Sequence, residues 1–312
     1  MRSSRLLSAL QSYQGLFGLA LLLGAAYWFD RTHFYSGGNL ANILNQLAVP
    51  GILAVGMTFV ILTGGIDLSI GSLLGLLNCI LATWIVADAS LILTTTYVLF
   101  VGALVGGFIG YLISVTRLQP FVVTLAAMVS LRGIAFVYTG RGTVSGLGEK
   151  LNFLTERQLG VPLSAWIMLA VTLIAAFVLK KTVFGRSVYA VGGNEEAARY
   201  AGISVPAVRI GAYSINGFCI GLAALIFTAR NTNGDPSAGM GYELDAITAV
   251  VVGGSSLLGG IGGVMGTFVG GLFIVCLNVL LILKGVDEHV GAGWKGVVIV
   301  IAVYLQNLNR RT

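Results

Sequence analysis

The feature that most constrains this chain is a series of long apolar stretches that together occupy most of its 312 residues. Only 10% of the residues are charged, against about 25% in an ordinary soluble domain, and the mean hydropathy is +0.92. A membrane-crossing helix needs about 20 mainly apolar residues, because the hydrocarbon core offers no partner to an unpaired backbone group. The composition therefore excludes an ordinary cytosolic enzyme and predicts an all-α transmembrane protein.

Ten apolar stretches are candidate membrane-spanning helices. They cover residues 15–29, 40–63, 66–87, 91–115, 121–138, 162–179, 207–229, 243–257, 261–283 and 290–305, of which the eighth is, with the first, the shortest. The first stretch also fits a signal peptide, but no small-residue cleavage pattern follows Trp28, so we interpret it as a retained helix.

The distribution of Lys and Arg predicts the orientation, because short loops rich in these residues stay in the cytoplasm. Starting in the cytoplasm and crossing ten times places ten cations inside, opposed only by Glu195 and Glu196, while most acids fall outside. We therefore expect both termini to be cytoplasmic.

Glycines recur at every fourth position in two of the stretches, which favours close packing of helices. They are Gly102, Gly106 and Gly110 in the fourth stretch and Gly262, Gly266 and Gly270 in the ninth. We interpret residues 1–312 as one transmembrane domain. If the shared glycine spacing reflects an internal repeat, this domain contains two repeats, at 40–140 and 207–308. The count of crossings places the two repeats in opposite orientations. Inverted repeats are typical of transporters. The general abundance of glycine is the alternative explanation.

The connection at residues 180–206 has the most unusual sequence of the chain. A glycine pair predicts a flexible turn, after which Asn194 can cap a short helix with two acids in its first turn. Gly202 supplies a stop near Ala201. A short helix between two spans has no core of its own, so we expect it to dock on another protein; a solvated helix on the membrane surface is the alternative. The docking residues are expected to be Gly192, Gly193, Asn194, Glu195, Glu196, Arg199 and Gly202.

Residues 184–203 of this connection resemble the coupling loop of permease subunits in ribose-type bacterial ABC sugar importers. Residues 54–72, which include Thr-Gly-Gly-Ile-Asp-Leu-Ser, and residues 241–247 and 252–260 are similar to two further signatures of that family. The likeness covers nearly the whole chain. The N-terminus is shorter than in the family, and the loop at 140–160 has no clear counterpart.

The resemblance implies a permease without catalytic residues, in the type II importer fold with about ten helices per subunit. It implies a dimer with a second copy or a homologous permease, a cytoplasmic ATPase that receives the coupling loop, and a periplasmic binding protein that delivers a small sugar. The bacterial inner membrane is the implied location, with lipid around the chain and no nucleic acid. ATP and Mg would bind the ATPase, so no cofactor or metal is expected on this chain.

Apart from Glu243 and Asp245, which we assign to the outer loop that leads into the eighth stretch, Asp67 is the only acid within a span, and an ionisable group there is a functional candidate. It follows a glycine pair at the start of the third stretch, so it can also cap a helix by accepting from the amide of Ser69 or Ile70. Both capping and a role in gating stay open. Capping predicts that Asp67→Asn is nearly silent.

Arg132 lies deep in the fifth stretch, where a charge costs at least about 2.5 kcal/mol unless it is paired or hydrated. We expect it to snorkel outward or to bind backbone carbonyls at the broken end of a neighbouring helix, in a structural role. Other polar residues within spans suit a sugar's hydroxyl groups along a translocation path, with interhelical hydrogen bonding as the alternative. They are Asn45, Gln46, Asn78, Asn216 and Asn278.

Residues 230–245 are rich in turn-forming residues and are expected to form an outer loop. Its acids Glu243 and Asp245 are candidates for docking basic residues of a binding protein. An ordinary solvated loop is the alternative.

Two classes of function compete with the importer. An ion-coupled secondary transporter is equally compatible with inverted repeats, but such carriers usually need carboxylates or unwound carbonyls at mid-membrane for the coupling ion. Asp67 is the only candidate, and we place it near one end of its span. A membrane enzyme is less favoured, because His33 and His289 fall in outer loops and no nucleophile with a nearby base is visible. The sequence also has no Gly-x-x-x-x-Gly-Lys-Ser/Thr phosphate loop, so an importer of this kind needs a separate ATPase.

Overall fold

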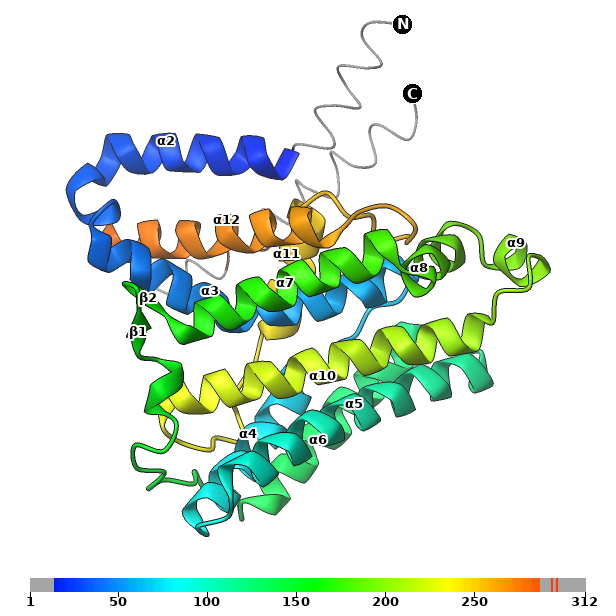
Figure 1. Ribbon diagram of the computed structural model, residues 1–312, viewed down its shortest axis with the longest axis horizontal. Coiled ribbons are helices and arrows are strands. Elements are labelled where there is room, and N and C mark those ends of the chain that lie inside the picture. Colours follow the sequence, from blue (N-terminus) through cyan, green and yellow to red (C-terminus); the bar gives the residue numbers. More distant parts are fainter. Residues whose placement is uncertain (1–13, 287–292, 294–295, 297–312) are drawn as a thin grey trace, which may run out of the picture.

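Helices dominate the computed structural model, which describes residues 14–286, 293 and 296 (Figure 1). The helices are α2 (Gln14–Phe34), α3 (Gly37–Leu62), α4 (Ile70–Val86), α5 (Leu91–Thr116), α6 (Pro120–Tyr138), α7 (Leu163–Lys181), α8 (Val183–Gly193), α9 (Glu195–Tyr200), α10 (Val205–Asn231), α11 (Tyr242–Val252) and α12 (Val264–Leu283). Between α6 and α7 lie a 3-10 turn, η1 (Asn152–Leu154), and the antiparallel two-residue strands β1 (Arg157–Gln158) and β2 (Val161–Pro162).

Six helices in the described part of the chain are long and apolar enough to cross a membrane: α3, α5, α6, α7, α10 and α12. The predicted ten crossings are not confirmed. The third and eighth predicted spans correspond to α4 and α11, which have only 17 and 11 residues because bent segments of chain precede them. The first predicted span falls in α2, and the tenth lies almost wholly outside the described residues.

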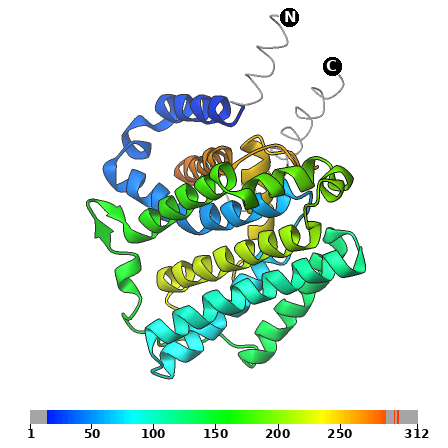
Figure 2. The ribbon, with the colours of Figure 1, turned by 45° about the vertical axis from the view of Figure 1, so that its right-hand side comes forward.

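The buried centre of the molecule is formed by α3 and α10, which pack against each other. Helix α5 runs along α10, while α12 packs against α2, α3 and α11. Figures 1 and 2 show α5 and α10 side by side, with α3 and α7 beyond α10. Helices α8 and α9 lie together at one end of the molecule, called the α9 end below, and β1 and β2 lie at the opposite end.

The first glycine series provides the expected smooth face on α5. A Cβ on Gly106 would overlap the carbonyl oxygen of Tyr213, and one on Gly110 would lie 2.9 Å from the Cα of Ile210, so the backbones of α5 and α10 touch. Small residues allow such close approach of membrane helices.

The second glycine series is only partly helical. Gly266 and Gly270 of α12 approach the backbone of α11 and of Gly253 just after it. Gly262 lies before α12, in the turn that follows α11, with a φ of +134°. The expectation of a third helical glycine was therefore wrong, because the chain requires a positive φ there.

Candidate functional site

Asp67 lies in a bend of non-helical chain at residues 63–69, between α3 and α4, called the first bend below. Its side chain is 1% exposed. One carboxylate oxygen accepts hydrogen bonds from the Ser69 amide at 2.8 Å and the Ser69 hydroxyl at 2.6 Å, and the other accepts from Nδ2 of Asn216 at 2.8 Å. The expected contact with the Ser69 amide is present. Asp67 also joins the bend to α10, which a simple cap would not do.

Other side chains secure the same bend. The carbonyl oxygen of Ile66 accepts a hydrogen bond from the hydroxyl of Thr124 at 3.1 Å and from that of Tyr213 at 3.5 Å. The Oδ1 atom of Asn216 is buried and has no hydrogen-bond partner among the described residues. It faces Gly56, where a Cβ would lie 2.6 Å away. The bend is thus held by neutral groups around one buried carboxylate.

A second bend, at residues 232–241, separates α10 from α11 and contains the same kind of turn. Oδ1 of Asp235 accepts a hydrogen bond from the Ser237 amide at 2.7 Å. Asn78 of α4 holds this bend: its Oδ1 accepts from the Asp235 amide at 2.8 Å, and its Nδ2 donates to the Asn233 carbonyl at 3.1 Å and to the Thr228 hydroxyl at 3.2 Å. Asn78 therefore forms hydrogen bonds between segments of the chain, which was the alternative to a contact with the sugar.

Arg132 of α6 binds the second bend through its guanidinium. Nη1 donates to the carbonyl oxygens of Pro236 and Ala238, the latter at 2.8 Å. Gly75 of α4 leaves the space, since a Cβ there would lie 2.7 Å from that nitrogen. Of the two arrangements considered for Arg132, snorkelling outward or binding backbone carbonyls, the structure shows the second.

Glu243 and Asp245 lie in the first turn of α11, and both are partly buried. Oε1 of Glu243 accepts from the Gly241 amide at 3.3 Å, and Oε2 lies beside Gly71 of α4, where a Cβ would be 2.6 Å away. The expectation of exposed loop acids was wrong, because the second bend folds inward and α11 begins at Tyr242. Their contact with a binding protein stays a prediction.

The remaining polar candidates lie elsewhere in the bundle. Oδ1 of Asn45 accepts a hydrogen bond from the Ser164 hydroxyl at 3.1 Å, which links α3 to α7. Gln46 follows on α3, and Asn278 lies in α12, each partly buried. Within the described residues no hydrogen bond joins these three side chains to either bend.

Helix α9 has the predicted caps. Oδ1 of Asn194 accepts from the Ala197 amide at 2.9 Å, and Gly202 follows the helix with a φ of +82°. Glu195 pairs with Arg199 at 3.0 Å and with Arg209 of α10 at 2.5 Å. Glu196 is exposed, and Tyr200 is 91% exposed. The helix therefore presents an outer face that nothing in the described chain covers.

The expected flexible turn at Gly192 and Gly193 was wrong, because both residues end helix α8. A Cβ on Gly192 would overlap the Leu62 carbonyl oxygen and lie 2.6 Å from the Gly260 amide, which itself donates to Leu62 at 3.0 Å. Gly193 faces open space. The end of α8 thus touches both the last residue of α3, directly before the first bend, and the turn between α11 and α12.

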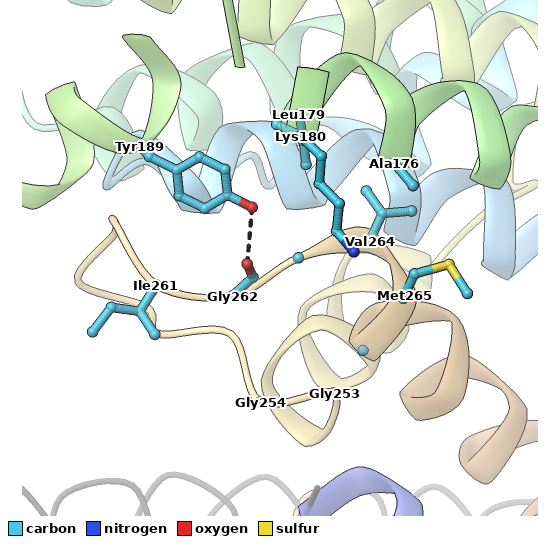
Figure 3. Close-up of a pocket in the computed structure, with 12 residues that line it drawn as sticks. Ala176, Leu179, Lys180, Tyr189, Gly253, Gly254, Ile261, Gly262, Val264 and Met265 are labelled. Carbon is cyan, nitrogen blue, oxygen red and sulfur yellow. Dashed lines mark hydrogen bonds between the residues drawn. The ribbon is translucent and has the colours of Figure 1, made fainter. Parts of the chain in front are cut away.

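A second contact ties α8 to that turn beside a cavity of about 340 Å³ (Figure 3). The Tyr189 hydroxyl donates to the Gly262 carbonyl at 2.9 Å, and Lys180 of α7 reaches toward the same turn. Burial raises the pKa of the Tyr189 phenol, so the hydroxyl keeps its proton at neutral pH and remains a donor.

Several of these residues escaped sequence reasoning, notably Tyr213, Asp235, Ser237 and Gly260. The sequence does contain a pattern that could have predicted the second bend. Asp-Leu-Ser at 67–69 and Asp-Pro-Ser at 235–237 share the spacing at which an Asp side chain accepts from the amide two residues later.

Comparisons with known proteins agree with the membrane architecture. A family model described as branched-chain amino acid transport system / permease component matches residues 39–305. The ribose import permease protein RbsC of Haemophilus influenzae is 43% identical over 279 residues, which cover 88% of this chain and 86% of that protein. Its namesake from Bacillus subtilis is 41% identical over 296 residues, covering 94% and 91%. The xylose transport system permease protein XylH of Escherichia coli is 31% identical over 349 aligned positions, covering 91% and 88%. No solved structure matches the chain.

Proposed function

The chain belongs to the branched-chain amino acid transport system / permease component family, and we propose that it moves a small sugar from a periplasmic binding protein into the cytoplasm. Relatives named as ribose and xylose permeases make it the permease subunit of a sugar ABC importer in the bacterial inner membrane. Because both named sugars are pentoses, a pentose is the first substrate to test. Hydrolysis of ATP with Mg would occur on a separate ATPase, and this chain would contribute the path.

The observation that supports ATPase docking best is the construction of the α9 end. Helix α9 is capped, charged and exposed on its outer face, so it offers a rigid contact for another protein. It follows α8 directly, and Gly192 at the end of α8 touches Leu62, the last residue of α3 before the first bend. Motion imposed on α9 would therefore reach the end of α3, from which the bend that holds Asp67 begins.

This arrangement also supports a cytoplasmic α9 end, and with it cytoplasmic termini and docking of the binding protein at the opposite end. A second permease copy or a homologous permease would complete the path. The ion-coupled alternative is not supported: the relatives are importer permeases, and Asp67 is engaged by Ser69 and Asn216.

The first experiment is gentle purification of the tagged chain from native membranes, followed by mass spectrometry of the proteins that accompany it. We expect an ATPase subunit in near-equal amount, and a periplasmic binding protein that can then be tested with ribose and xylose. A chain that purifies alone and moves solute into vesicles without ATP would contradict the proposal.

A matched pair of substitutions locates the ATPase contact. Ala197 is exposed on α9, and Ala87 is exposed beyond the end of α4, away from the α9 end. Ala197→Arg should abolish co-purification of the ATPase, whereas Ala87→Arg should leave it unchanged. Equal co-purification in both variants would exclude this face of α9.

A second test of α9 exchanges the charges of its own ion pair. Glu195→Lys combined with Arg199→Glu keeps an opposite-charge pair inside α9 but places a lysine against Arg209. We expect transport to be lost while the protein stays in the membrane. Normal uptake by this double variant would contradict the coupling role of α9.

A further inference from the structure

A cavity of about 660 Å³ opens at the α9 end, between the turn that joins α5 to α6 and the segment from α9 to the start of α10. Its charged lining consists of Arg117, Arg199, Arg209 and Glu195. We call it the arginine cavity.

The charges in the arginine cavity do not balance. Glu195 pairs with both Arg199 and Arg209, and Arg117 forms no ion pair among the described residues. Three guanidinium groups therefore face one carboxylate, which leaves two uncompensated positive charges. Guanidinium groups bind phosphate oxygens by charge-assisted and often bidentate hydrogen bonds.

The backbone keeps Arg117 in this position. It ends α5 in the left-handed conformation, with a φ of +56°, and the first turns of α6 and α10 line the same cavity. The Gln119 and Ser204 side chains make no capping bonds at these two helix starts. The positive ends of the two helix dipoles add to the potential of the guanidinium groups.

One wall of the arginine cavity continues into an apolar surface. Leu118 lines the cavity and is 51% exposed, and the neighbouring Val115, Phe121 and Val122 are 61%, 50% and 50% exposed. On a membrane protein, exposed side chains of this kind on α5 and α6 meet lipid tails. A site with cations at its end and an apolar wall leading from it has the two halves needed for a phospholipid.

We propose that the arginine cavity binds the phosphodiester headgroup of an anionic phospholipid, with an acyl chain lying along Leu118 and the ends of α5 and α6. The phosphate would be held by Arg117 together with Arg199 and Arg209, and so would compete with Glu195 for the latter two. Binding of an anionic lipid would thereby weaken the ion pairs that Glu195 of α9 forms with Arg199 and Arg209. The assignment to the cytoplasmic leaflet rests on the proposed function, whereas the binding itself does not.

The test uses the full-length chain in a neutral detergent and follows its thermal unfolding during titration with three probes. These are a short-chain phosphatidylglycerol, the matching phosphatidylcholine and inorganic phosphate. A ligand that binds only the folded state raises the unfolding temperature. We expect phosphatidylglycerol to stabilise the chain, and phosphatidylcholine and phosphate to do so weakly or not at all.

Arg117→Gln should weaken the effect of phosphatidylglycerol by roughly fivefold in apparent affinity, the contribution of one basic residue beside an anionic lipid. Arg230→Gln, in the last turn at the opposite end of α10, is the matched control and should keep it. Arg117 is exposed and unpaired in the described structure, so the lipid-free unfolding temperature should be unchanged.

Three results would overturn the proposal. Equal stabilisation by phosphatidylcholine would show that the arginine cavity does not distinguish an anionic headgroup from a neutral one. Equal stabilisation by inorganic phosphate would identify a free-anion site without a lipid. An Arg117→Gln variant that binds phosphatidylglycerol normally but loses its co-purifying ATPase would make the cavity a protein contact. The lipid measurement is independent of transport, so its failure and that of the proposed function are distinguishable.

Discussion

The first bend, at residues 63–69, and the second bend, at residues 232–241, both contain an Asp-x-Ser turn, but they are secured in chemically opposite ways. In the first, the acid of the turn itself gathers donors, from Ser69 and from Asn216. In the second, Arg132 arrives from another helix and supplies donors to two carbonyl oxygens. Non-helical chain within a membrane protein needs such partners, because no water satisfies it there. The comparison teaches that one charged side chain of either sign, a buried carboxylate or a partly buried guanidinium, can serve this purpose.

The two bends also exchange supports. Asn216 of α10, which precedes the second bend, binds the first bend, and Asn78 of α4, which follows the first bend, binds the second. The second bend has more supports, since Val144 and Gly234 also form a backbone bridge. We therefore expect substitutions around the second bend to act mainly on stability, and those at the first bend to act mainly on transport.

Arg132→Leu should have the largest effect on stability. It removes two hydrogen bonds from a charged donor, each worth about 1.5–3 kcal/mol, and we expect a loss of about 4 kcal/mol in the free energy of unfolding. Titration with a denaturing detergent measures it. Arg141→Leu, at an exposed position just beyond α6, is the control. A loss as small as the control's would mean that the second bend does not depend on the guanidinium.

Asn78→Leu should follow, with a loss of about 3 kcal/mol, because three neutral hydrogen bonds of about 1 kcal/mol each disappear. The same titration checks it, with Asn42→Leu on the exposed side of α3 as the matched substitution. If Asn78→Leu proves neutral, the exchange of supports between the bends is not energetically important.

Gly192→Ala should cost about 2 kcal/mol, within the range of about 1–3 kcal/mol for overpacking, and should impair transport more than its stability loss explains. The added methyl group would press on the carbonyl of Leu62, the last residue of α3 before the first bend. The measurement is sugar uptake per ATP hydrolysed by the reconstituted importer. Gly193→Ala, one residue later and facing open space, should behave like wild type. If both variants take up the same amount of sugar per ATP hydrolysed, the contact of α8 with Leu62 does not contribute to coupling.

Asp67→Asn should have the smallest effect on stability, less than about 1 kcal/mol. The new amide oxygen can still accept from Ser69, and rotation of the Asn216 amide can turn its unpartnered Oδ1 toward the new NH₂ group. Asp67→Leu removes both possibilities and should cost about 2–3 kcal/mol as the comparison variant. A nearly stable Asp67→Asn protein that no longer transports sugar would assign the charge itself to gating.

Sequence reasoning succeeded where the deciding interaction is local or unavoidable. Asn194 and the two acids after it are enough to predict α9, because an N-cap acts within one turn. Arg132 lies in an apolar span, so a partner was required, and backbone carbonyls were among the few available.

Prediction failed where distant parts of the chain decide the outcome. The turn-forming residues at 230–245 have the composition of an exposed loop, but contacts from distant parts of the chain, notably Arg132 and Asn78, more than 100 residues away, draw the second bend inward. Gly192 lies at the end of a helix, where its lack of a side chain admits the Leu62 carbonyl, a contact that no local pattern reveals.

The hydrogen bond between Asp67 and Asn216 has a consequence for how the protein is made. The two residues are 149 positions apart, and a ribosome adds about 5–20 residues per second, so the acid waits roughly 7–30 s before its partner is synthesised. During that interval the first half of the chain has an incompletely paired carboxylate in or near the bilayer. Membrane insertion must therefore hold α3 and α4 in a provisional arrangement until α10 arrives, and a fragment ending before α10 should be a substrate for membrane quality control.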